Sequence, residues 1–92
     1  MSESPSSWQI LYTESAKSEI EHLDGPIRKI IKRAIEEKLM VEPLKFGLPL
    51  RRSLLGFFKL RVGNYRIIYK IEKKEVIVLV ISVGHRKEVY KS

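Results

Sequence analysis

The 92-residue chain has no cysteine, so disulfides, thiol nucleophiles and cysteine metal sites are excluded. It contains no HExxH, GxSxG, P-loop or GxGxxG motif and no acidic cluster suited to a metal. The longest apolar run, Val76 to Val83, includes Ser82 and is too short to span a bilayer. The opening MSESPSSW has neither the basic nor the apolar region of a signal peptide. We therefore expect a cytoplasmic protein that needs no cofactor, no metal and no membrane.

Positive charge is in clear excess. The chain has 18 basic and 11 acidic residues, which gives a formal net charge of +7. Such a balance in a small domain indicates an anionic partner, which could be nucleic acid, an acidic protein or a membrane surface. The alternative is a basic protein whose charge serves solubility alone. The positions of the charges must decide between these interpretations.

The first half of the chain predicts a strand and a helical hairpin. Residues 1–7 are polar and read as a flexible tail, and residues 8–92 form a single domain. A strand is predicted over residues 8–12, and Thr13 or Ser15 can cap the helix that follows. Asp24-Gly25-Pro26 ends that helix, and apolar residues then recur at helical spacing up to Leu39. The two helices should share one apolar face.

The second half predicts three antiparallel strands. Phe57 to Val62 alternates, and Gly63-Asn64 is a two-residue hairpin turn that pairs Val62 with Tyr65. A second tight turn at Lys73-Lys74 would pair Ile71 with Val76 and Tyr69 with Val78. The expected fold is α+β: a four-stranded antiparallel sheet with the helical hairpin on one face, in the order β-α-α-β-β-β.

The predicted register gathers cations on the face of the sheet that the helices leave open. Lys59, Arg61, Arg66 and Lys70 share it, and Arg61 lies directly across from Arg66. Like charges in direct opposition destabilise a sheet by roughly 0.2–1 kcal/mol. The pair is explained if an anion such as a phosphate binds between the two side chains. Solvent screening is the alternative. The apolar residues Ile77, Leu79, Ile81 and Val83 are predicted to lie on the same face.

The chain ends in a short basic and aromatic segment after a turn at Gly84. Arg86 offers five fixed donors and a permanent charge, and Tyr90 can stack on a base. His85 is an acid–base candidate with a pKa near neutrality, although a single histidine in a turn is more often structural. Cations alone can support RNA cleavage, because the 2′-OH supplies the nucleophile and cations stabilise the phosphorane.

The segment LRVGNYRIIYKIEKKEVIVLVISVGHRKEVY resembles the signature of RelE-type toxins of bacterial toxin–antitoxin modules, in the RelE/ParE superfamily. The likeness is strongest over about the last 36 residues, and the upstream β-α-α order agrees with it. It implies a RelE-like microbial ribonuclease-type fold. It also implies a cytoplasmic endoribonuclease that cuts mRNA in the A site of the 70S ribosome and is silenced by a cognate antitoxin, which should be small, acidic and amphipathic.

The resemblance also implies roles for single residues. Lys59, in KLR, would act as the base or stabilise the deprotonated 2′-OH, and Arg66, in YR, would stabilise the phosphorane. Arg86, in VGHR, would assist the leaving oxygen, and Tyr90, in EVY, would stack on the substrate base. Three further residues are expected to bind the RNA: Arg61, His85 and Lys87.

Two departures from the family pattern bear on the general base. Phe57 stands where the best-known members carry a second lysine, and the segment between Arg86 and Tyr90 is shorter by about two residues. His85 or Lys87 could therefore carry the proton. Two other functions stay open: a ParE-like toxin that poisons DNA gyrase without ribonuclease chemistry, and a non-catalytic module that binds RNA or the ribosome.

Overall fold

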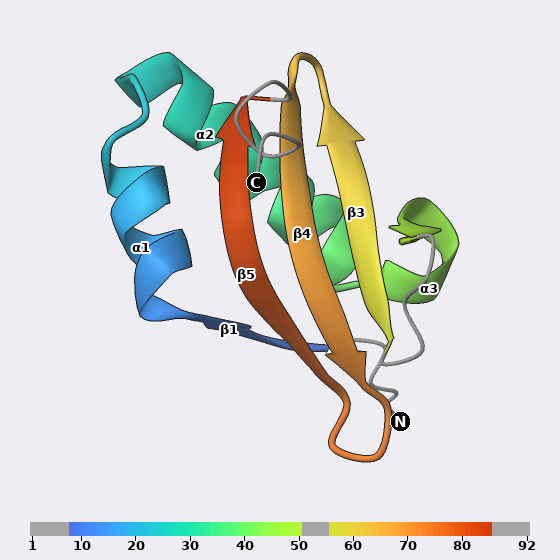
Figure 1. Cartoon of the computed structure of the whole chain (residues 1–92). Helices are drawn as coiled ribbons and strands as arrows, with labels where there is room; N and C mark the ends of the chain where they lie inside the picture. Colours follow the sequence, from blue (N-terminus) through green and yellow to red (C-terminus); the bar gives the residue numbers. More distant parts are fainter. Residues whose placement is uncertain (1–7, 51–55, 86–92) are drawn as a thin grey trace, which may run out of the picture.

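A computed structural model of the chain describes residues 8–50 and 56–85, so the tail predicted over residues 1–7 lies outside the described residues. A twisted sheet forms one layer and the helices form the other (Figure 1). The strand order is β1-β5-β4-β3-β2. The strands are β1 (Gln9–Tyr12), β2 (Leu48–Pro49), β3 (Phe57–Val62), β4 (Tyr65–Glu72) and β5 (Ile77–His85). The helices are α1 (Glu14–Glu21), α2 (Gly25–Ala34), the π-helix η1 (Ile35–Leu39) and α3 (Pro43–Phe46).

The α+β class and the helical hairpin are confirmed, but the predicted four-stranded antiparallel sheet is wrong. The sheet has five strands and is mixed, because β1 runs parallel to β5 at one edge. The sequence places β1 and β5 at opposite ends of the chain, so no turn motif fixes their relative direction. The extra strand, β2, pairs only Leu48 with Lys59 and Pro49 with Phe58. Two residues are too few to show the alternation that predicts a strand.

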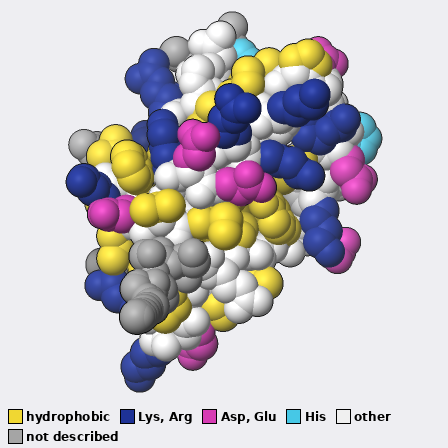
Figure 2. All heavy atoms as spheres, turned by 180° about the vertical axis from the view of Figure 1, so that it is seen from behind, with side chains coloured by type: hydrophobic (Ala, Val, Ile, Leu, Met, Phe, Trp, Pro, Cys, Tyr) yellow, Lys and Arg dark blue, Asp and Glu magenta, His cyan; other side chains and the backbone are white. Residues whose placement is uncertain are grey.

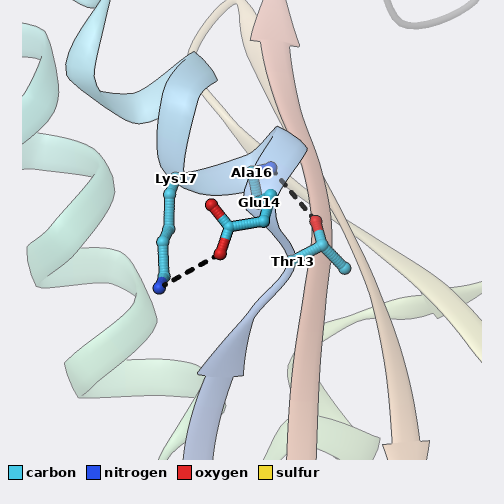
Figure 3. Close-up of polar contacts among 4 residues, drawn as sticks. All are labelled: Thr13, Glu14, Ala16 and Lys17. Carbon is cyan, nitrogen blue, oxygen red and sulfur yellow. Dashed lines mark hydrogen bonds and ion pairs between the residues drawn. The ribbon is translucent and has the colours of Figure 1, made fainter.

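The helical hairpin begins where its sequence predicts. Thr13 caps α1 by accepting a hydrogen bond from the backbone N–H of Ala16 at 3.1 Å, and Glu14 pairs with Lys17 at 3.7 Å (Figure 3). Seen from behind, the helical side carries many lysine and arginine side chains interspersed with acidic ones (Figure 2). No helix within residues 8–50 and 56–85 is both long and apolar enough to cross a bilayer.

The core lies between the sheet and the helices. Its buried members are Ala16, Ile20, Ile31, Ala34, Ile35, Leu39, Leu60, Ile67, Tyr69, Ile71, Val78, Val80 and Val83. Tyr69 is fully buried, and its hydroxyl donates a hydrogen bond to the carbonyl of Pro43 at 2.7 Å. Burial raises the pKa of Tyr69. A Cβ at Gly47 would collide with the Tyr69 hydroxyl, so the connection between α3 and β2 requires glycine for space.

The register of β3 and β4 is as predicted, whereas that of β4 and β5 differs. Gly63 takes a positive φ of 60° in the two-residue turn, and Val62 pairs with Tyr65. The second turn is longer than predicted, so Ile71 pairs with Val78 instead of Val76. A β-bulge follows, because Tyr69 pairs with Val80 but Ile68 pairs with Ser82. The bulge reverses the alternation, and it moves Val83 from its predicted place on the open face into the core.

Candidate functional site

Four cations share the face of β3 and β4 that points away from the helices. We call Lys59, Arg61, Arg66 and Lys70 the cationic face. The pairs Lys59–Ile68, Arg61–Arg66 and Phe57–Lys70 define it, and their neighbours on the opposite face include the buried Leu60 and Ile67. Alternation along both strands therefore separates the cations from the core. The structure brings together the predicted residues Lys59, Arg61 and Arg66.

Arg61 and Arg66 lie directly across from one another, as the sequence predicts. Arg61 is exposed, but Arg66 is only 8% exposed and is the one buried charged residue among those described. On its other side Arg66 pairs with Gly84 of β5, which has no side chain to fill the neighbouring position. Two guanidinium groups beside an empty side-chain position suit a planar, bidentate contact with a phosphate.

A pocket at the edge of the cationic face adds residues that the sequence did not single out. It has a volume of about 260 Å³ and is lined by Lys38, Phe46, Leu48, Lys59, Leu60, Arg61 and Arg66. Lys38 belongs to η1, and its ammonium lies 5.9 Å from the ring centre of Phe46 in α3. A π-helical turn often accompanies a functional site, because it rotates side chains out of α-helical phase. No sequence signal marked Lys38.

The register also shows what lies beside Phe57, the residue that stands where the best-known family members carry a second lysine. Phe57 pairs directly with Lys70, and the Lys70 ammonium lies 5.7 Å from the centre of the Phe57 ring. A cation therefore stands over the aromatic ring that replaces the lysine. Lys70 also forms an ion pair of 3.1 Å with Glu72. Cross-strand counting from the Gly63-Asn64 turn identifies Lys70 as a neighbour of Phe57, and it is a further candidate for RNA binding.

His85 lies on the other side of the sheet from Arg66. Its ring contacts that of Tyr65 edge to face, with centres 5.5 Å apart, and the two residues are cross-strand partners. Tyr65 packs against the core, so His85 faces the helices. Both rings line a pocket of about 470 Å³ that also includes Glu19, His22 and Asp24. The structure thus separates His85 from Lys59, Arg61 and Arg66, and its role in RNA binding stays a prediction.

Three predicted residues, Arg86, Lys87 and Tyr90, lie outside the described residues. Their place in the site is therefore a prediction from the sequence. Among residues 8–50 and 56–85, no three histidine, aspartate or glutamate side chains are grouped so that they could hold a metal ion. What the described part of the site offers chemically is positive charge with fixed donors, on a rigid two-stranded ribbon.

The chain is similar to toxins of known families. The family described as the ParE toxin of the type II toxin–antitoxin system parDE matches residues 10–90. Toxin RelG from Mycobacterium tuberculosis is 32% identical over 84 residues, which is 91% of this chain and 97% of RelG.

Solved structures share the fold as well as the sequence. The toxin–antitoxin complex RelBE2 from M. tuberculosis matches with a TM-score of 0.80 and 32% identity, over 87% of this chain and 92% of the other. The isolated E. coli RelE toxin matches with a TM-score of 0.72 and 27% identity, over 91% and 92% of the two chains. With nearly the whole length matched in sequence and structure, the chain belongs to the ParE toxin family, and it is a type II toxin of the RelE/ParE superfamily.

Proposed function

We propose that this toxin is an endoribonuclease that cleaves mRNA in the ribosomal A site and so inhibits translation. The observation that carries the proposal is the opposed pair Arg61 and Arg66, with Lys59 on the same face. A sheet selected for stability alone would seldom place two arginines in direct opposition. Binding of a phosphodiester between them would remove the repulsion and stabilise negative charge at the reacting phosphorus.

The proposed reaction uses the 2′-OH of the substrate as its nucleophile. Lys59 removes the 2′-OH proton in its neutral form, or holds the deprotonated oxygen as a cation. The 2′-oxygen then attacks the adjacent phosphorus, and Arg66 stabilises the charge of the pentacovalent phosphorane. The bond from phosphorus to the 5′-oxygen breaks, Arg86 stabilises the negative charge that develops on this oxygen, and water supplies its proton. Tyr90 stacks on the base and orients it.

Further cations would hold the RNA without taking part in bond breaking. Arg61 lies across from Arg66, Lys70 belongs to the same cationic face, and Lys38 lines the pocket at its edge. Each can contact a neighbouring phosphate. This chemistry requires no metal or cofactor, because the substrate supplies the nucleophile and the side chains supply the charge. His85 and Lys87 stay candidates for proton transfer or RNA contact.

The positive charge of the chain also indicates which partners it binds. We propose that a cognate antitoxin binds the toxin and silences it in the cytoplasm. The similar toxins from Methanococcus jannaschii and E. coli form complexes with RelB antitoxins. An acidic, amphipathic antitoxin would complement a chain with a net charge of +7. The 70S ribosome would position the mRNA, because the described site holds cations but few groups that could orient a single strand.

The alternative function is inhibition of DNA gyrase. The matching family carries the name ParE, which favours keeping this activity in view. The grouping of Lys59, Arg61 and Arg66 favours the nuclease instead, because binding to a protein target does not require an opposed arginine pair. A third possibility, a non-catalytic RNA-binding module, predicts binding without strand cleavage.

The decisive experiment maps new 5′ ends on a translated mRNA, with and without ribosomes. We expect cuts at a fixed position within codons, only when ribosomes are present. Arg66→Ala and Arg86→Ala should each abolish the cuts and relieve growth arrest while leaving antitoxin binding largely intact. Lys74→Ala is the matched control, because it removes one positive charge from the exposed turn at the far end of the β4–β5 hairpin.

Each alternative has its own outcome in this experiment. An mRNA without new ends, together with normal translation, would contradict the nuclease. Accumulation of cleaved DNA with purified gyrase would then favour the ParE-like activity. If the arginine variants lost antitoxin binding but still cleaved mRNA, the assignment of the cationic face to catalysis would be wrong.

A further inference from the structure

The outer edge of β5 changes its partner partway along the strand. β1 pairs with Ile77 to Val80 and then ends at Tyr12. The next residues of β5, from Ile81 to Val83, extend beyond that pairing. Such an edge leaves backbone N–H and C=O groups without a strand to bond, and each costs free energy if it is buried unsatisfied.

Helix α1 supplies the bonds that β1 no longer provides. The Thr13 N–H donates to the carbonyl of Val80 at 3.0 Å, and the Thr13 hydroxyl donates to the carbonyl of Ile81 at 3.1 Å. Six residues further along the chain, the Oε1 atom of Glu19 accepts the N–H of Val83 at 2.8 Å and the hydroxyl of Ser82 at 3.2 Å. The charged carboxylate makes these bonds stronger than a neutral acceptor would.

The residues held in this way are those of the bulge. Ile81 is the extra residue of β5, since Tyr69 pairs with Val80 and Ile68 with Ser82. The bulge determines to which face of the sheet each later residue of β5 points. Val83 points into the core, Gly84 lies across from Arg66, and His85 lies against Tyr65. Without the extra residue, the faces of Gly84 and His85 would be exchanged.

We propose that Glu19 is a positioning residue that fixes this bulge and thereby the alternation that places Gly84 across from Arg66 and His85 against Tyr65. Glu19 acts through the backbone of Val83 and the hydroxyl of Ser82, and it contacts no substrate. The geometric part stands on the structure alone. The consequence for catalysis rests on the proposed function, because Gly84 leaves the position beside Arg66 open, and Arg66 is proposed to stabilise the phosphorane.

Anchoring of the helix is a separate matter from fixing the bulge. Helix α1 buries Ala16 and Ile20 in the core, and Thr13 caps it. These contacts do not depend on Glu19. Substitution of Glu19 should therefore release the bulge and leave the helix in place, which makes its role separable from general stability.

The test compares three variants of the full-length toxin. Glu19→Ala removes the acceptor, Glu19→Asp keeps the charge but withdraws the oxygens by one methylene, and Glu19→Gln keeps an oxygen at the same reach. Ile20→Val is the control, because it removes a buried methylene from the neighbouring position without affecting the bulge bonds. Hydrogen exchange of the Val83 amide and the nuclear Overhauser contact between Tyr65 and His85 report the bulge directly.

We expect exchange of the Val83 amide to rise by about 100-fold in Glu19→Ala and by about tenfold in Glu19→Asp, because its acceptor is lost or displaced. The Tyr65–His85 contact should weaken in both variants. In single-turnover mRNA cleavage, the rate should fall by about 10- to 100-fold in Glu19→Ala with substrate affinity unchanged, as expected of misplaced groups. Glu19→Gln should stay within about threefold of the wild type in rate, because its amide oxygen still accepts. Ile20→Val should lower the melting temperature without changing either reporter.

Unchanged protection of Val83 and an unchanged Tyr65–His85 contact in Glu19→Ala and Glu19→Asp would overturn the proposal. A Glu19→Ala variant whose bulge is released but which cleaves mRNA at the same rate as Ile20→Val would also overturn it. If Glu19→Ala does not fold, Glu19→Asp decides by the same measurements. A wild-type toxin that cuts no mRNA would refute the proposed function and the catalytic consequence, while hydrogen exchange still decides whether Glu19 fixes the bulge.

Discussion

The two faces of the β3–β4 hairpin differ in the surroundings of their side chains: one face is buried in the core and the other carries clustered positive charge. On one face Leu60, Ile67 and Tyr69 are buried against the helices, and even the Tyr69 hydroxyl has a backbone partner. On the other face Arg61 opposes Arg66, and cations outnumber acids. The first face accounts for the stability of the fold. The second face gathers like charges, and we propose that it binds an anionic ligand, so substitutions on the two faces should have different effects.

The largest expected effect is on activity and comes from the cationic face. Lys59→Ala and Arg66→Ala should each lower the rate of mRNA cleavage by about 100-fold or more, as loss of one group that stabilises transition-state charge usually does. Single-turnover kinetics on ribosome–mRNA complexes measure the rate. Lys73→Ala, in the exposed β4–β5 turn, is the charge-matched control and should cleave at the wild-type rate. Equal losses in all three variants would mean that net charge, and not this face, drives cleavage.

The next largest effect is on stability and comes from the core face. Gly47→Ala places a Cβ against the Tyr69 hydroxyl and should cost about 1–3 kcal/mol of unfolding free energy, typical of overpacking. Gly25→Ala is the matched control, because a Cβ there meets nothing within 4 Å. Urea unfolding measures both. A Gly47→Ala variant as stable as Gly25→Ala would contradict the close contact between the α3–β2 connection and the sheet.

A third effect appears only at alkaline pH. Burial raises the pKa of Tyr69 above its usual value near 10, so the unfolded chain releases the proton first. The contribution of protonated Tyr69 to the unfolding free energy is fully present below pH 10. It declines by about 1.4 kcal/mol per pH unit as the pH rises toward the pKa of Tyr69 in the folded protein. In Tyr69→Phe this part of the decline should disappear, although the variant loses the bond to Pro43. Urea unfolding from pH 7 to 11 measures the difference.

The raised pKa of Tyr12, caused by burial and then by Glu36, leaves a residual alkaline decline in both proteins. The wild type should therefore be the more stable protein at pH 8, and its advantage should shrink above pH 10. Parallel stability curves for the two proteins across this range would argue that Tyr69 ionises as readily in the folded state as in the unfolded chain.

The smallest effect is a gain in stability on the cationic face. Arg61→Ala removes one member of the opposed pair and should raise the unfolding free energy by roughly 0.2–1 kcal/mol, while it weakens RNA binding. High salt should shrink the gain, because it screens the repulsion in the wild type. Lys73→Ala should show neither change. A destabilised Arg61→Ala variant would indicate that the arginine pair is held by other contacts and is not a cost to the fold.

The cationic face could be predicted from the sequence because a two-residue turn determines its register. Gly63-Asn64 leaves one pairing for β3 and β4, and strict alternation then assigns each side chain to a face. The cap predicted at Thr13 or Ser15 and the break at Asp24-Gly25-Pro26 were equally local signals. The structure places the cap at Thr13 and ends α1 before the break.

The same counting was wrong for β5. The turn between β4 and β5 is longer than the two residues assumed, and a bulge adds Ile81, so Val83 lies on the core side. The turn predicted at Gly84 is also wrong, because β5 continues through Gly84 to His85. Residues 80–83 contain no glycine, proline or asparagine that would mark a bulge. Its bonds come from Thr13 and Glu19, more than 60 positions away in sequence. Lys38 was missed because an η1 side chain reaches the pocket beside β3 only through packing.

Local patterns in the chain were enough to predict the two-layer α+β class, the helical hairpin, the β3–β4 register and the grouping of Lys59, Arg61 and Arg66. All of these depend on contacts between near neighbours in the chain, where turn type and periodicity leave few alternatives. Only the tertiary structure decided the parallel pairing of β1 with β5, the short strand β2, the bulge and the side of the sheet on which His85 lies. These depend on hydrogen bonds between distant segments, and the sequence carries no local signal for such bonds.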